Sequence, residues 1–151
     1  MDPTALIVSA LATGAAAGLK PLAEQTIKDA YASIKAFIRS KYPSVSLEPL
    51  EKKPDSEAKR SSTAEDLTEA GADEDNELLE RSKALLDTVK QHDRQAAEAI
   101  GVDIEEVEAE YLKIQKVRAS GTGVQVRKSK FSGGIDLGEI DAGERDKPPK
   151  A

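Results

Sequence analysis

The chain has 151 residues, the length of one average domain or of two small ones. It carries 28 acidic and 22 basic side chains, and this net charge of -6 argues against a general nucleic-acid binder. It has no cysteine, which excludes disulfides, thiolate metal sites and cysteine nucleophiles, and its single histidine, His92, cannot form a histidine-rich metal cage.

Charge divides the chain into three segments of different composition. Residues 1–43 hold 5 basic and 3 acidic side chains, residues 44–111 hold 8 and 20, and residues 112–151 hold 9 and 5. The net charges of the segments are therefore +2, -12 and +4. A chain polarised in this way contains distinct faces or modules.

The first segment begins with a helix that carries no charged side chain. Asp2 and Pro3 are typical of a helix start, and the next charged residue is Lys20. Because a secretory signal needs a cationic start, Asp2 argues against export. Residues 3–19 span roughly 26 Å at about 1.5 Å per residue, which is shorter than the ~20 apolar residues of a standard membrane span.

Small residues suggest that this helix packs closely against its neighbours. Ala10, Gly14 and Gly18 lie four residues apart, a spacing that lets helix backbones approach one another. Two interpretations are open: a central buried helix of a small bundle, and a helix that leaves such a bundle to enter a membrane. The candidates for membrane insertion are Leu6, Ile7, Val8, Leu11, Gly14, Gly18 and Leu19.

Further helices are predicted up to residue 100. The expected elements are a helix with one apolar stripe over 20–42, a connector over 44–60 with a short turn around Leu47 and Leu50, a weaker helix over 55–70 ended by Gly71, a strong helix over 73–92, and a short piece over 94–100. Together with the first helix they predict an antiparallel helical bundle over residues 1–100. We expect the imidazole of His92 to be a capping or surface group without a chemical role.

The most specific pattern is a four-fold repeat between Val102 and Gly143. The units are VDIEEVEAEY, LKIQKVRASGTG, VQVRKSKFSGG and IDLGEIDAG, with apolar residues at places one, three, six and eight except for Ser129. These places alternate as in strands, and glycines follow where the chain must turn. The pattern predicts a β-arch stack over residues 101–143, a short β-solenoid of cross-β type. Its assembly core comprises Leu112, Ile114, Val117, Val124, Val126, Phe131, Ile135, Leu137 and Ile140.

Charges select a stacking register for the repeat. The first and fourth units are acidic, and the second and third are basic. If two units form one coil of about 22 residues, the first unit stacks on the third and the second on the fourth. In every such layer acidic side chains lie opposite basic side chains. The charges that set this register are Glu106, Glu108, Lys116, Arg118, Lys128, Lys130, Glu139 and Asp141. Each exposed pair adds only ~0.2–1 kcal/mol, so the pairs specify register more than they stabilise it.

The first unit has a second interpretation. Ile104, Val107, Tyr111 and Ile114 also fit the helical period, and glutamate favours helices. Whether residues 102–111 form strand or helix is therefore left open. The expected fold class is α+β, a helical bundle followed by the β-repeat and by a polar tail over residues 144–151.

This layout resembles the bacterial Bell-domain proteins, which are HeLo-like cell-death effectors. The resemblance rests on the apolar stretch from Ala5 to Leu19 and on the tail from Gly121 to Gly143. The tail is similar to amyloid signalling motifs: two pseudo-repeats per coil are similar to the fungal HET-s-type prion fold. Val124-Gln125-Val126 is similar to the centre of the RIP homotypic interaction motif.

The resemblance implies a cytoplasmic effector of a cell-death or immune-like response. A sensor protein with a matching motif would nucleate the tail, the chain would form a homo-oligomer or fibril, and the first helix would act on a membrane, with which the protein would then associate. No cofactor, metal or nucleic acid is expected. The alternative is a non-toxic adaptor that oligomerises through the β-solenoid and binds a protein partner through its bundle.

Catalysis is not expected. The sequence has no Gly-x-Ser-x-Gly motif, no P-loop and no metal-ligand pair. The acidic residues of segment 44–111 fall mostly on predicted helix surfaces, which is typical of a solvated face.

The repeat predicts self-assembly of the isolated peptide 102–143. Stacked strands would give a fibre reflection at ~4.7 Å and bind dyes of the Congo-red type. A peptide that stays monomeric at high concentration would contradict this prediction.

Overall fold

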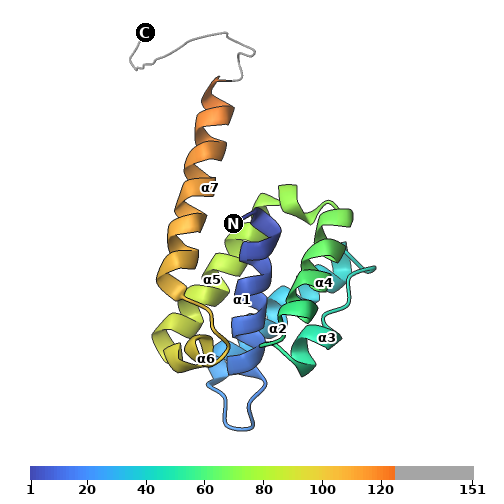
Figure 1. The fold of residues 1–151 in the computed structure, drawn as a ribbon, viewed down its shortest axis with the longest axis vertical. Helices are drawn as coiled ribbons and strands as arrows, with labels where there is room; N and C mark the ends of the chain where they lie inside the picture. The colour runs from blue at the N-terminus through green and yellow to red at the C-terminus, as the bar shows by residue number, and fades with distance from the viewer. Residues whose placement is uncertain (125–151) are drawn as a thin grey trace. The chain divides into compact units, whose positions relative to one another are not determined.

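The computed structural model describes residues 1–124, and within this range all regular elements are helical (Figure 1). The elements are α1 (Pro3–Gly18), α2 (Gln25–Lys41), α3 (Glu48–Lys52), α4 (Glu57–Glu69), the short 3-10 helix η1 (Ala72–Glu74), α5 (Asn76–His92), α6 (Arg94–Ala99) and α7 (Ile104–Val124). The chain divides into two compact units, residues 1–111 and 112–151. The first unit is a helical bundle, to which α7 contributes its first two turns.

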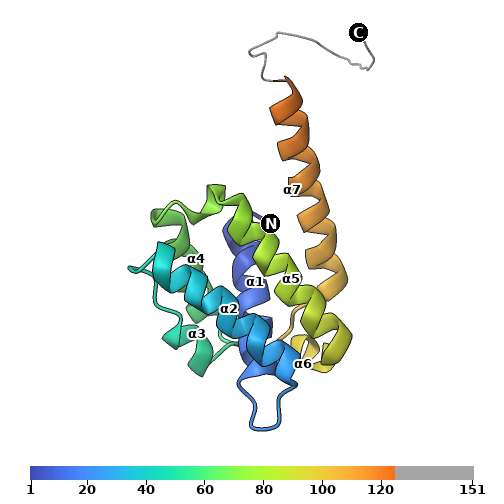
Figure 2. The same cartoon turned by 180° about the vertical axis from the view of Figure 1, so that it is seen from behind.

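Helix α1 is the central element of the bundle. It contacts α2, α3, α4, α5 and α6, and Figures 1 and 2 show α2, α4 and α5 around it. Twelve of its sixteen residues are buried, which no other helix of the described part approaches. In the folded chain α1 is therefore the buried central helix of the first interpretation, and its entry into a membrane stays a prediction.

Side-chain caps define where the major helices begin. The carboxylate of Asp2 accepts a hydrogen bond from the Ala5 amide at 2.8 Å, and Asp75 does the same for the Leu78 amide at 3.0 Å. Such caps satisfy amides that have no partner within the helix. Gly71, with a φ of 83°, follows α4 in the left-handed conformation that favours glycine. The helices predicted up to residue 100 are all present. The start predicted at residue 20 for the second helix is wrong, because residues 20–23 form a turn and α2 begins at Gln25, and the other ends shift by at most three residues.

A buried carboxylate joins the end of α2 to the start of α5. Asp75 accepts hydrogen bonds from the Tyr42 hydroxyl at 2.5 Å and from Nζ of Lys41 at 2.8 Å. Burial by itself would raise the pKa of Asp75, but these hydrogen bonds and the Leu78 amide outweigh it and hold the pKa below its usual value. The carboxylate is therefore ionised near neutral pH and fixes the two helix ends together.

The strand predicted for the second repeat unit is wrong, and the open choice for the first unit is decided in favour of helix. Residues 104–124 form the continuous helix α7 instead. Ile104, Val107 and Tyr111 recur at helical spacing and are all buried, and Asp103 caps the Glu106 amide at 3.1 Å. The glutamates between them favour helix over strand. The helical interpretation of residues 102–111 is therefore the correct one, and the α+β class is replaced by an all-helical fold over the described residues.

The correction extends to the predicted assembly core and register. Leu112, Ile114 and Val117 lie in α7, which ends at Val124, rather than in strands. The same helix contains four of the residues predicted to set the register: Glu106, Glu108, Lys116 and Arg118. Glu108 forms an ion pair with Lys90 of α5 at 2.9 Å, and not with a basic side chain of the third unit. The remaining predicted residues lie outside the described range: Val126, Lys128, Lys130, Phe131, Ile135, Leu137, Glu139, Ile140 and Asp141.

Gly14 allows α1 and α5 to approach closely. A Cβ atom at this position would lie 2.6 Å from Cδ2 and 3.0 Å from Cγ of Leu85. Leu85 is only 1% exposed, so it has little room to move away. A Cβ atom at Gly18 would lie 3.4 Å from the nearest atom, Cγ2 of Ile27, which is ordinary van der Waals contact.

These contacts predict opposite effects of two identical substitutions. Gly14→Ala should lower the free energy of unfolding by about 1–3 kcal/mol because the added methyl group overpacks the core. Gly18→Ala is the matched control, and it should leave stability unchanged or raise it by up to ~1 kcal/mol, because alanine is the better helix former. Urea unfolding measures both. Equal stability of the two variants would show that the close approach at Gly14 is not required.

Candidate functional site: the buried helix α1 and the contacts that hold it

The predicted insertion residues lie together in the core of the bundle, with one exception. Leu6, Ile7 and Leu11 have no exposed surface, and Val8 is 3% exposed. Gly14 and Gly18 are also buried. Leu19 follows the helix and is half exposed, so the structure separates it from the other candidates.

Helix α1 makes few polar contacts with its surroundings. It has no charged side chain, and the Thr13 hydroxyl donates to the Ser9 carbonyl at 2.7 Å within the same helix. The Thr4 hydroxyl lies 3.0 Å from Oδ1 of Asp2 and 3.1 Å from the hydroxyl of Thr68 on α4. Removal of α1 would therefore leave no unpaired buried charge, and apolar packing supplies most of what holds it.

The first turns of α7 cover α1 from the other end of the chain. Tyr111 is fully buried, and its hydroxyl donates to the carbonyl of Leu6 at 3.3 Å. Burial raises the pKa of Tyr111, so the hydroxyl keeps its proton. The N-terminal amine forms an ion pair with Glu110 at 3.3 Å. Sequence reasoning did not identify Tyr111 as a contact of α1, although its helical spacing from Val107 was visible.

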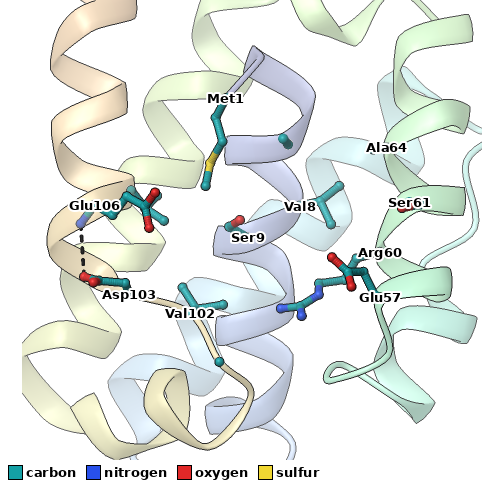
Figure 3. Close-up of a pocket in the computed structure, with 13 residues that line it drawn as sticks. Met1, Val8, Ser9, Glu57, Arg60, Ser61, Ala64, Val102, Asp103 and Glu106 are labelled. Atoms are coloured by element: carbon teal, nitrogen blue, oxygen red, sulfur yellow. Dashed lines mark hydrogen bonds between the residues drawn. The ribbon is translucent and has the colours of Figure 1, made fainter.

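A groove opens beside α1. It has a volume of about 260 Å³ and lies between α1, α4 and the start of α7 (Figure 3). Ala5 and Ser9, both half-buried residues of α1, line it. The charged side chains that line it are those of Glu57, Asp103 and Glu106 and that of Arg60. α1 is therefore separated from solvent by little protein at this position.

Between residues 1 and 124, no group of three histidine, aspartate or glutamate side chains is placed to hold a metal ion. In the same range, no helix combines the length and the apolar character needed to cross a membrane.

These features define a helical bundle that encloses an uncharged N-terminal helix. The model of the Het-E N-terminal domain family matches residues 1–145, and the chain belongs to this family. The resemblance to HeLo-like cell-death effectors is thereby confirmed at the level of the domain family. The match includes both the bundle and the greater part of the C-terminal segment. No curated protein and no solved structure matches the chain.

The contact between α7 and α1 predicts graded losses of stability at Tyr111. Tyr111→Phe removes only the hydroxyl, which should cost about 0.5–1.5 kcal/mol. Tyr111→Ala leaves a cavity against α1 and should cost about 3–5 kcal/mol. Leu112→Ala is the matched control, since Leu112 is 61% exposed, and its effect should stay within about 0.5 kcal/mol. Thermal and urea unfolding measure the series, and similar values at both positions would refute the proposed cover.

Proposed function

We propose that this protein is a self-assembling effector of a cell-death or immune-like response, in which α1 acts on a membrane after assembly of the C-terminal segment releases it. Membership of the Het-E N-terminal domain family supports this assignment. Before assembly the protein is cytoplasmic, and afterwards it associates with the membrane. Its partners are further copies of the chain, or a sensor protein with a matching repeat.

The observation that carries the proposal is the composition of α1 in its surroundings. Helix α1 is buried and uncharged, and its Thr13 hydroxyl is hydrogen-bonded within the helix. It can therefore exchange contacts with protein for contacts with lipid without leaving a buried charge or this hydroxyl unpaired. Lipid tails are about as apolar as a protein core. In water, by contrast, a released α1 would expose its apolar side chains to solvent. A released α1 therefore favours a membrane over solvent.

The position of α7 supplies a route for release. The first two repeat units, residues 102–123, lie almost wholly in this helix, and the first unit provides Tyr111 and its neighbours to the cover of α1. A residue cannot belong to an α-helix and to a β-stack at once. Assembly of all four units as strands would therefore unwind α7 and uncover α1.

The length of α1 indicates that several copies act together. Its 16 residues span roughly 24 Å at about 1.5 Å per residue, which is short of the ~30 Å hydrocarbon core. The Ala10, Gly14 and Gly18 row allows released helices to pack closely against one another. Assembly would gather these helices at one place on the membrane.

A reversible lock on α1 tests the proposal. The hydroxyls of Thr4 and Thr68 are 3.1 Å apart and join α1 to α4, and the chain has no native cysteine. Thr4→Cys/Thr68→Cys should therefore form one disulfide that holds α1 in the bundle. Leakage of dye from phospholipid vesicles should fall at least tenfold when the disulfide is formed, and it should return on reduction.

Two controls make the result specific. The single variant Thr68→Cys should leak equally under oxidising and reducing conditions. Dye binding by the C-terminal segment should be recorded in parallel, so that loss of assembly is distinguished from retention of α1. Leakage that is unaffected by the disulfide would refute the release of α1.

The alternative function is that of a non-toxic adaptor, and the deep burial of α1 favours it. In this case the repeat oligomerises the chain, and the bundle binds a protein partner while it stays folded. If the protein is an adaptor, vesicles should not leak in either redox state. Oligomerisation should be unchanged when the disulfide is formed. Deletion of α1 is a poorer test, because it would remove the centre of the core.

A further inference from the structure

The loop between α1 and α2 carries large apolar side chains that no other part of the bundle covers. Leu22 is 97% exposed and Leu19 is 52% exposed, and Pro21 between them is exposed as well. The loop lies at one end of the bundle and extends past the helices in both views (Figures 1 and 2). We call Leu19, Pro21 and Leu22 the apolar tip.

The apolar tip is held in an ordered turn. The Ala23 amide donates to the Lys20 carbonyl at 3.2 Å, which places Pro21 and Leu22 at the two central positions of a β-turn. Nζ of Lys20 lies 2.7 Å from Oδ2 of Asp93 and ties the loop to the segment between α5 and α6. The exposure of Leu22 is thus built into the turn, and Asp93 offsets the charge of Lys20.

The size of the apolar tip favours lipid over protein as its partner. A stable protein interface buries about 800 Å² on each side, far more than three residues of a turn can supply. Insertion into the bilayer interface has no such threshold, because each apolar side chain that leaves water contributes separately. A phospholipid surface is therefore the occupant that fits this tip.

We propose that the apolar tip inserts shallowly into a phospholipid surface while the bundle is still folded. The inference deepens the proposed function, because it assumes that a membrane is the target. The loop follows α1 directly, so docking brings the C-terminal end of α1 to the lipid before release. One tip binds weakly, and an assembly of several copies binds much more tightly because their tips act together.

Tryptophan fluorescence tests the docking, since the chain has no native tryptophan. With vesicles of phosphatidylcholine, the emission of Leu22→Trp should shift to shorter wavelength and should be quenched by brominated lipid. Ala36→Trp, at an exposed position on α2, is the matched control and should show neither effect. Leu22→Ser should lower the partition of the unlabelled protein onto vesicles about tenfold, and added salt should change binding little.

The same experiment separates docking from release. Leu22→Trp combined with the Thr4→Cys/Thr68→Cys disulfide should still dock, because docking does not require α1 to leave the bundle. A fluorescence shift without leakage would leave the docking intact and refute the release. Absence of a shift with vesicles would overturn the docking, as would a shift that depends only on protein concentration, which would identify contact between copies.

Discussion

The packing of an uncharged helix at the centre of the bundle is the constraint on which the rest of the structure depends. Most of α1 is enclosed, and Gly14 lets Leu85 approach its backbone. Since α1 offers almost no polar contacts, its neighbours must supply apolar surfaces on nearly every side. This explains why even the C-terminal helix α7 contributes to its cover through Tyr111.

The segment that covers α1 carries two patterns at once. Ile104, Val107 and Tyr111 follow the period of a helix, whereas the four-place repeat that contains them follows the alternation of strands. In the folded bundle the helical period prevails, because it places all three side chains in the core. In an assembly of many copies the repeat would gain contacts that a single chain cannot make. The two arrangements compete for the same residues, which is the physical basis of the proposed release.

The proposed membrane contacts differ in what they require of the fold. The apolar tip is exposed in the bundle and needs no rearrangement, whereas α1 can reach lipid only when its cover is removed. Docking by Leu22 would therefore precede release of α1, and the local turn would determine the first step while the tertiary packing would determine the second. This order keeps an apolar helix away from water until a lipid surface is adjacent.

The sequence by itself determined the helices of residues 3–100, because local signals encode them: Asp2 at the start of α1, Gly71 as a stop and the apolar stripe of α2. The sequence placed Asp75 inside the first turn of its helix, and only the structure shows that it is the cap of α5. The sequence also identified α1 as an uncharged helix suited to close packing. Tertiary structure decided the conformation of the first turns of α7. The apolar residues there fit both the alternation of a strand and the spacing of a helix, and the burial of Ile104, Val107 and Tyr111 adds to the local preference of the glutamates for helix. The contact of Tyr111 with Leu6 joins residues 105 positions apart, and no local pattern can encode such a pair.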